Sequence, residues 1–436
     1  AVIGDGSEAP ESPARWAVID GLATLADRSL VTVSADDPPR YRLLDTMRAF
    51  ARQAMAETDG EFEAVRRQHA RALTAWFMRY TPSDVATQLY MADIENAREA
   101  IGWARVHDLH QAALLTARAA RISTFYVWRN ECTQWLRALQ PAMVSSAGQA
   151  LPAEVQATWW TEMARTATFL GDPQARTAAR RALALWQPLQ QPMQALFAAV
   201  VWVRSIEQAG DELDEACAAL QAQAAATPPP TARERFWLLG ALTKAALVRG
   251  DDAAVLEGRL AEVTLGQELG SDDLVETAES NVVNTLNALQ RHAEAAERGR
   301  VLLSRIDRRN RDENANLPWV LAGLLEALTD IGRLDEARAL VPRACAVSRR
   351  FNALAPLPSM PWLAASQGRF EAAARLVGHV RQRFEARGAT PDRGENGLLE
   401  RAWQAAEQAL GAAQVDGLLR LGRALDEDAA AALAAG

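Results

Sequence analysis

The sequence predicts a mainly α-helical protein, in which a right-handed superhelix of helical hairpins follows a partial winged helix with a small β-hairpin. Two observations carry this prediction. A turn signature recurs with a period near 40 residues through most of the chain, and a short stretch of β-branched and turn-forming residues interrupts the helical pattern near the start. Because a single hairpin cannot bury its apolar stripe alone, a sustained period of this length is typical of hairpins that stack on their neighbours.

The β-hairpin is expected within residues 1–58, the predicted C-terminal part of a winged-helix domain. Apolar residues of 18–27 share one helical face, and 29–33 changes to the alternation typical of a strand. A proline-containing turn leads to a return strand over 41–44. Asp45 is expected to cap the helix that follows, its carboxylate accepting a backbone N–H. Helix, two strands and helix are the back half of a winged helix.

Three further regions follow in the predicted organisation. Helices over about 61–80 and 92–106 form a connecting segment, 59–110. Helical repeats are expected over 111–409, and capping helices over 410–436.

The repeated turn signature explains how each hairpin reverses. Glycine ends the first helix in left-handed geometry, a charged turn follows, and small alanines let the second helix pack closely against the first. The signature begins at Gly171, Gly210, Gly250, Gln290, Gly332 and Gly368.

Composition excludes some classes of function. The net charge is −8, from 47 basic and 55 acidic residues, which argues against binding nucleic acid through an overall positive field. We expect no direct nucleic-acid contact from this chain. Lys244 is the only lysine, and alanine follows it, so the sequence contains no GxxxxGK[ST] phosphate-binding loop.

Cysteine usage and hydropathy indicate the compartment. Cys132, Cys217 and Cys345 are far apart and odd in number, which fits a reducing cytoplasm, and we expect three buried thiols. No apolar run reaches the roughly 18–20 residues of a membrane span. The chain starts without methionine or a signal-peptide pattern, so we expect a cytoplasmic piece of a longer protein.

Catalytic motifs do not stand out. No GxSxG, HExxH or paired-carboxylate pattern is recognisable. His107 and His110 are spaced to share one helical face, but no acidic or cysteine partner joins them at ligand spacing, and zinc normally needs three or four protein ligands. We therefore expect neither an enzyme nor a metal site, and we expect “VHDLH” to mark a junction between helices.

Several segments resemble a known family. The chain contains “IDGLATLADRSLVTV” and “RYRLLDTMRAFARQAM” near its start. These resemble the winged-helix region behind the nucleotide-binding module of bacterial STAND-class transcriptional regulators, predicted ATPases of the NB-ARC type. The segment “DIENAREAIGWA” is similar to the helix that opens their repeat region. Residues 373–391 and 410–434 look like the family's last tetratricopeptide-like repeat and its cap.

The resemblance implies a function. A nucleotide-binding module and a DNA-binding domain would lie upstream in a parent protein, with ATP or ADP bound there and no cofactor in this chain. The repeats would bind a protein, peptide or small-molecule effector on their concave face, and the winged helix would relay that state to the upstream module. Such coupling needs different contacts in two states. The alternative is a tetratricopeptide-type peptide-binding adaptor without a switch.

The resemblance also suggests where related proteins contact a bound nucleotide, which is the strand-to-helix junction. In related NB-ARC proteins a histidine at this junction reaches the ADP phosphates. Aligned on “LLDTMR”, that position falls on Leu44, with Asp45 next to it and Arg48 one turn further on. Leucine neither donates a hydrogen bond nor carries charge, so we expect the direct phosphate contact to be lost. We predict that these residues form a joint near the nucleotide; the simpler alternative is a helix cap and an exposed helix face.

A row of asparagines suggests where an effector binds. The amides of “ESNVVNTLNAL” recur every third residue in the first helix of a predicted hairpin, and an amide offers both donor and acceptor to a peptide backbone. Glu276 and Ser280 precede them at helical spacing and extend the row. The alternative is an exposed polar face without a ligand. The predicted binding residues are Asn281, Asn284 and Asn287, with Arg204 and Glu207 on the first helix of another hairpin.

Overall fold

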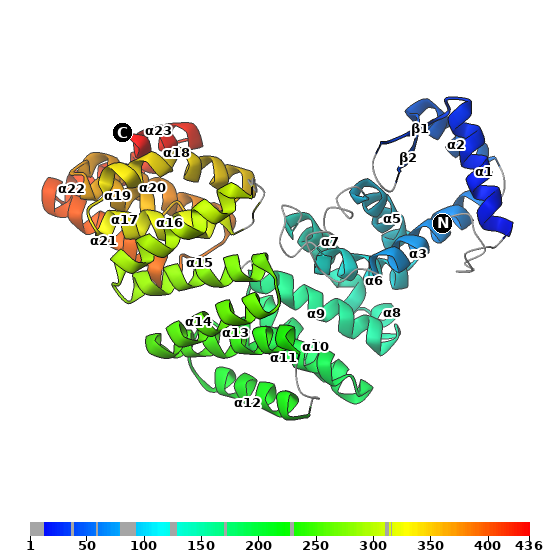
Figure 1. Ribbon diagram of the computed structural model, residues 1–436, viewed down its shortest axis with the longest axis horizontal. Coiled ribbons are helices and arrows are strands. Elements are labelled where there is room, and N and C mark those ends of the chain that lie inside the picture. Colours follow the sequence, from blue (N-terminus) through cyan, green and yellow to red (C-terminus); the bar gives the residue numbers. More distant parts are fainter. Residues whose placement is uncertain are drawn as a thin grey trace. The chain divides into compact units, whose positions relative to one another are not determined.

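The computed structural model describes residues 13–35, 39–57, 60–78, 93–122, 129–169, 172–226, 231–309, 314 and 316–436. Nearly all of these residues are helical, and the sheet found among them has two strands (Figure 1). The predicted mainly α fold class is confirmed.

The first elements follow the predicted order. Helix α1 (Pro13–Asp27) precedes strands β1 (Val31–Val33) and β2 (Tyr41–Leu43), and helix α2 (Asp45–Ala56) comes next. The strands are antiparallel, with Thr32 opposite Arg42. Residues 36–38 of the predicted turn lie outside the described residues.

The prediction that Asp45 caps α2 is wrong. The strand ends at Leu43, so the helix begins one residue earlier than expected and its N-cap is Leu44, which gives no side-chain hydrogen bond. Asp45 is instead the first residue of the helix, with a highly exposed carboxylate 3.7 Å from Arg48. A carboxylate in the first turn still favours the helix through its dipole.

The helices that follow pack through small and apolar residues. Helix α3 packs against both α5 and α6, and Trp103 of α5 donates through Nε1 to Glu63 of α3 at 2.7 Å. Residue 108 separates α5 from α6, as “VHDLH” predicted. These helices are α3 (Glu61–Met78), α5 (Ile94–His107), α6 (Leu109–Ile122), α7 (Arg129–Val144), α8 (Ser146–Gln149) and α9 (Ala153–Phe169).

From α10 onward one helix follows another with short connections, and most of them are 12 to 18 residues long. A short 3₁₀ turn, η2 (Gln187–Leu189), follows α10. The helices are α10 (Gln174–Trp186), α11 (Pro192–Arg204), α12 (Asp211–Ala226), α13 (Ala232–Arg249), α14 (Asp252–Glu268), α15 (Asp272–Ala288), α16 (His292–Arg308), α17 (Leu317–Asp330), α18 (Leu334–Phe351), α19 (Ser359–Ser366), α20 (Phe370–Arg387), α21 (Arg393–Leu410), α22 (Ala412–Arg423) and α23 (Glu427–Ala435).

Consecutive helices pack against each other, and several first helices also contact the next first helix: α11 with α13, α15 with α17, and α17 with α19. The turns between paired helices use the predicted geometry at Gly250, Gly332 and Gly368, whose φ values are 78°, 76° and 73°. Gln290 adopts it without being glycine, at φ 59°. Gly210, at φ 153°, does not, and Gly171 lies outside the described residues.

The described residues divide into two compact units, with the boundary inside α9 after Trp159. The first unit contains α1 to α8 and the start of α9, apart from the first two residues of α7. The second contains the rest, and a large core cluster within it extends from Phe236 to Ala434. The three cysteines are buried thiols outside any disulfide, as predicted.

Candidate functional site

Arg204, the last residue of α11, has a guanidinium with few partners. The side chain is partly buried, yet no hydrogen bond, ion pair or ring contact joins it to another described residue. It lies over α13 at Gly240, where an added Cβ would stand 3.5 Å from Arg204 Nη1 and 3.6 Å from Glu262 Oε1. Arg204 and Glu262 therefore both pack close to the backbone of Gly240.

Two internal ion pairs lie near this guanidinium. On α9, Arg165 Nε donates to Glu162 Oε2 at 2.7 Å, and both side chains are buried. On α14, Arg259 Nη1 donates to both carboxylate oxygens of Glu262, at 2.9 and 3.0 Å, and the Glu262 side chain is only 3 % exposed. With Arg204, these four residues form what we call the Arg204 cluster.

The electrostatics of the cluster follow from its composition. Burial lowers the pKa of Arg204 below its ordinary value; the neighbouring Arg259 and, more weakly, Arg165 lower it further, while Glu262 opposes them. Arginine nevertheless stays protonated in proteins. Arg204 therefore stays charged, and among the causes that shift its pKa Glu262 is the one that attracts it.

Glu207 lies apart from the cluster's buried pairs. It follows the end of α11, rather than lying on the first helix as predicted, because α11 ends at Arg204. Its exposed carboxylate accepts from Lys244 Nζ at 2.7 Å.

The predicted asparagines share α15 but face different surroundings. Asn287 is only 3 % exposed; its amide donates to the Gly323 carbonyl of α17 at 2.8 Å, and its Oδ1 lies 3.3 Å from His292 Nδ1. Asn284 packs over the same glycine, where an added Cβ would overlap its Oδ1. Both Asn281 and Asn284 are partly exposed. The Asn287 amide is therefore engaged within the fold, and only the other two offer partly exposed side chains.

The proposed extension of this row is buried. Glu276 is fully buried and accepts from Arg309 Nη1 at 2.9 Å and from the Asn314 amide. The Ser280 hydroxyl is buried without a hydrogen-bond partner among the described residues. We have no physical account of that unpaired hydroxyl.

A second polar group, which the sequence did not reveal, joins α17, α19 and α21. Asp330 Oδ1 accepts from Trp362 Nε1 at 3.1 Å, and Asp330 also pairs with Arg401, whose guanidinium lies 3.9 Å from the centre of the Trp362 ring. Burial is the main cause that raises the pKa of Glu326 to about 7, and the charges of Asp330 and Asp392 act in the same direction. Arg401 and a hydrogen bond from Asn287 oppose this rise. A carboxyl that titrates near neutrality therefore lies on the first helix α17.

The predicted joint lies in the first unit. Leu44 is 43 % exposed, and within the described part of the chain Asp45 and Arg48 pair with each other alone, across one turn at the helix surface. Large apolar side chains of α1, both strands and α2 are also exposed: Trp16, Ile19, Val33, Tyr41, Leu43 and Phe50. The described residues thus leave large apolar side chains of these first elements uncovered.

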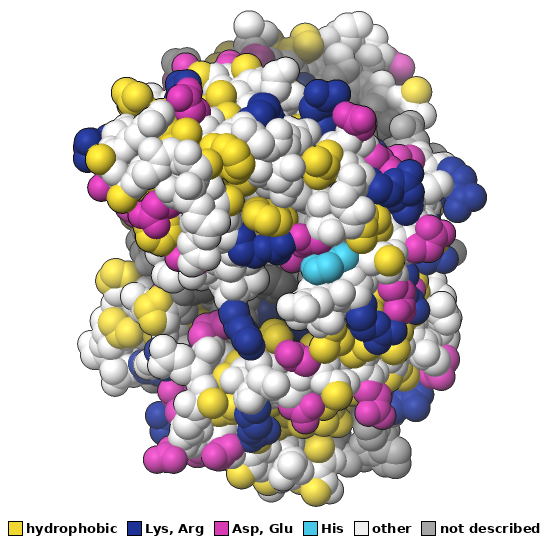
Figure 2. Space-filling view, turned by 90° about the vertical axis from the view of Figure 1, so that its left-hand side faces the viewer, with side chains coloured by type: hydrophobic (Ala, Val, Ile, Leu, Met, Phe, Trp, Pro, Cys, Tyr) yellow, Lys and Arg dark blue, Asp and Glu magenta, His cyan; other side chains and the backbone are white. Residues whose placement is uncertain are grey.

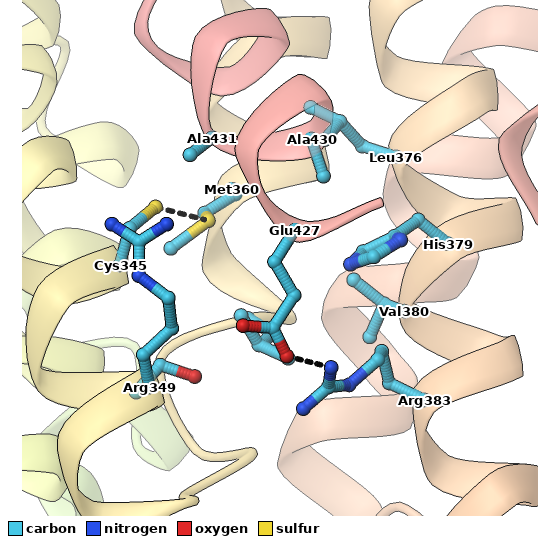
Figure 3. Close-up of a pocket in the computed structure, with 12 residues that line it drawn as sticks. Cys345, Arg349, Met360, Leu376, His379, Val380, Arg383, Glu427, Ala430 and Ala431 are labelled. Carbon is cyan, nitrogen blue, oxygen red and sulfur yellow. Dashed lines mark hydrogen bonds and ion pairs between the residues drawn. The ribbon is translucent and has the colours of Figure 1, made fainter. Parts of the chain in front are cut away.

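A small hollow with a cavity volume of about 30 Å³ lies between α18, α19, α20 and α23. Figure 3 shows Glu427 of α23 paired with Arg383 of α20 in its lining, and Cys345 Sγ beside the sulfur of Met360 at 3.8 Å. His379 Nδ1 lies 3.1 Å from the Leu425 carbonyl. The polar side chains named here all have partners within the chain. The hollow therefore fits a contact by which α23 packs on the fold better than it fits a ligand site.

Surface charge has mixed sign. Figure 2 shows one face of the molecule, where basic and acidic side chains are interspersed with apolar ones. Within the described residues, no three or more His, Cys, Asp or Glu side chains gather as metal ligands, and no helix is long and apolar enough to cross a bilayer. No protein-family model matches the chain, and a search of curated proteins finds no match.

Proposed function

We propose that this chain is the regulatory arm of a signal-transducing ATPase transcriptional regulator of the STAND class. Its helical pairs form a right-handed, tetratricopeptide-like superhelix that binds an effector on its concave face. The first elements form a partial winged helix that passes this state to an upstream nucleotide-binding module, where ATP or ADP binds.

The uncovered apolar surface of the first unit carries this proposal. Trp16 is 56 % exposed and Phe50 is 67 % exposed, and Tyr41 and Leu44 lie exposed on the elements between them. Large apolar side chains that stay exposed on neighbouring elements of the sequence are the kind of surface that another module would cover. A module that packs against α1, the β-hairpin and α2 would remove these side chains from water, at roughly 25 cal/mol per Å² of apolar area.

The joint residues fit a mechanical role within this proposal. Leu44 offers an apolar contact at the start of α2, and Asp45 and Arg48 neutralise each other at its surface. A module that packs here would therefore contact the end of α2, and no charged side chain of the joint would bind its nucleotide phosphates. The direct nucleotide contact that the resemblance suggests is replaced by packing.

The test uses the upstream module. If the reading frame upstream encodes a domain with a GxxxxGK[ST] loop, that domain is co-expressed with the 436-residue chain and their affinity is measured by calorimetry. We expect a complex that Phe50→Asp weakens by at least about tenfold, because a charge would be buried at the contact.

The matched control is Val301→Asp, on the second unit, where the side chain is similarly exposed at 60 %. This variant should bind the module like the unaltered chain. If both aspartate variants bind equally well, the relay through the first unit is wrong. A chain that binds no nucleotide module but retains peptides on its repeats would instead be an adaptor without a switch.

A further inference from the structure

We propose that the groove lined by α18, α19 and α20 binds a short amphipathic helix of a partner protein, and that α23 occupies this groove as an internal competitor. The inference goes beyond the proposed function, because it concerns neither the nucleotide-binding module nor the effector of the concave face. Helix α23 contacts all three helices of the groove. Its last turn, its first turn and its buried face are each held by different residues.

A recurring turn of the second unit departs from its pattern where it meets α23. In two earlier turns the arginine pairs with a glutamate three residues further on: Arg291 with Glu294 at 2.5 Å, and Arg333 with Glu336 at 2.7 Å. In the next turn the arginine is Arg369, and the residue three positions further on is alanine. The acid that engages the other two arginines is therefore absent from this position.

Arg369 binds the last turn of α23 instead. Its Nη1 donates to the Leu433 carbonyl at 2.9 Å and its Nη2 to the Ala434 carbonyl at 3.0 Å, while its Nε donates to Gln367. The last carbonyls of a helix have no partner within that helix, and a cation beside them is favoured by the helix dipole. Because these acceptors belong to the backbone, Arg369 would receive the end of any helix that fits the groove.

Two further arginines face the first turn of α23. Arg349 of α18 pairs with Asp428 at 2.5 Å, and Arg383 of α20 pairs with Glu427 (Figure 3). The Asp428 side chain is 91 % exposed, and exposed ion pairs contribute little to stability. The groove therefore favours a helix with acidic residues in its first turn, but these pairs hold α23 only weakly.

The apolar part of the groove is only partly filled. The buried side chains of α23 are those of Ala430 and Ala434, and the hollow of about 30 Å³ lies beside Ala430, with Met360 and Val380 also in its lining. That volume has room for about two water molecules. A helix with a larger apolar side chain at the position of Ala430 would extend into the hollow and bury more apolar area than α23 does.

These features favour the exchange of α23 for another helix. Its last turn is held through backbone atoms, its first turn through exposed ion pairs and its buried face through alanines, so α23 opens at a lower cost than the whole unit unfolds. A partner helix with an acidic first turn and a larger apolar residue in place of Ala430 would make the same polar contacts and also fill the hollow. Helix α23 would then reduce the affinity for this partner by occupying its site.

Labelling of Cys345 with N-ethylmaleimide measures the opening of α23, because this thiol is 7 % exposed and lines the hollow. Mass spectrometry of the 436-residue protein locates the label, and Cys132 and Cys217 report any general loosening. Glu427→Gln combined with Asp428→Asn removes both ion pairs and leaves the groove unaltered. We expect this double variant to raise the labelling rate of Cys345 at least about fivefold, with the other two thiols unchanged.

Asp211→Asn combined with Glu212→Gln is the matched control. It removes two acids from the first turn of α12 and leaves every residue of α23 and of its groove in place. The labelling rate of Cys345 should not change. The inference is overturned if the α23 double variant labels Cys345 no faster than the unaltered protein, or if all three thiols react faster together.

A fluorescein-labelled peptide of residues 425–436 that carries Ala430→Val supplies the helix from outside. Valine adds two carbon atoms that can extend into the hollow. By fluorescence anisotropy, the peptide should bind the α23 double variant at least about fivefold more tightly than the unaltered chain, because the open groove is more populated by that factor. Equal affinity for both chains, or binding to neither, would contradict the proposal.

Arg369→Gln, added to the α23 double variant, tests whether the peptide lies in the groove. It should weaken peptide binding at least about tenfold, because two hydrogen bonds from a charged group are lost. Arg333→Gln, at the equivalent place in the preceding turn, should have no effect. Equal peptide affinity in these two variants would show that the groove is not the site. If light scattering shows that the double variant dimerises and the dimer excludes the peptide, the groove takes α23 of a second copy and the partner assignment is wrong.

Discussion

The carboxyl of Glu326 lies among groups that favour its neutral form. Its pKa of about 7 exceeds the ordinary value of 4.5, so the folded protein holds this proton more tightly than the unfolded chain does. The stability that this group contributes is fully present below pH 4.5 and is lost as the pH rises through about 7. Glu395, whose pKa burial and Asp392 also raise to about 7, acts in the same direction.

Glu326→Gln tests this dependence. The variant stays neutral, so its unfolding temperature should fall less between pH 5 and pH 8 than that of the unaltered protein. A shift of one pKa unit corresponds to about 1.4 kcal/mol, so we expect a difference of roughly 1–3 kcal/mol at pH 8. Differential scanning calorimetry at a series of pH values measures it.

The control for this prediction is Glu297→Gln on α16, where the side chain is 73 % exposed. It should leave the pH profile unchanged. Parallel profiles for Glu326→Gln and the unaltered protein would contradict the role of burial at Glu326.

At the scale of elements, two glycines allow α20 and α22 to pack closely against each other. A Cβ on Gly422 of α22 would overlap the Arg375 carbonyl oxygen of α20, and one on Gly378 would overlap the Leu419 carbonyl oxygen of α22. Because the obstructing atoms are backbone, neither helix can relax by changing a rotamer. The absence of two side chains thus sets the close approach of these helices.

Gly422→Ala should therefore destabilise the second unit by about 2–4 kcal/mol, since the helices must separate and lose contacts elsewhere. Gly417→Ala in the same helix meets no atom within 4 Å and should stabilise by up to about 1 kcal/mol through helix propensity. Thermal unfolding of the two variants measures the difference. Similar midpoints would show that the close contact is not needed.

At the scale of the whole molecule, two compact units imply unfolding in more than one step. Leu115 of the first unit and Leu328 of the second are both fully buried. Truncating a buried leucine to alanine typically costs about 2–5 kcal/mol. We expect Leu115→Ala to lower the midpoint of one calorimetric transition and Leu328→Ala that of another.

This expectation depends on the units being energetically separate, because two-state behaviour fails for chains with more than one domain. A single transition that both substitutions lower equally would indicate one cooperative unit. Circular dichroism should give the same midpoints as calorimetry if each transition reports helix loss.

Local patterns were sufficient to predict the helices and their turns. The turn at Gly332 was found because left-handed backbone favours glycine, a rule that concerns only neighbouring residues. Asp45 shows the limit of such local rules. Aspartate suits both the N-cap and the first turn of a helix, and the end of the preceding strand at Leu43 decided between the two positions. The sequence likewise indicated a polar row on α15, but not that Asn287 would bond to a carbonyl of α17.

The sequence by itself determined the mainly helical class, the small β-hairpin and several turns between helices, because periodicity and turn chemistry act over a few residues. Only the tertiary structure decided which polar groups meet. Arg204 was named from its helix alone, whereas its neighbours Arg165 and Arg259 come from α9 and α14, far away in the chain. The physical reason is that charge balance and burial depend on distances between helices, and no local spacing rule encodes those distances.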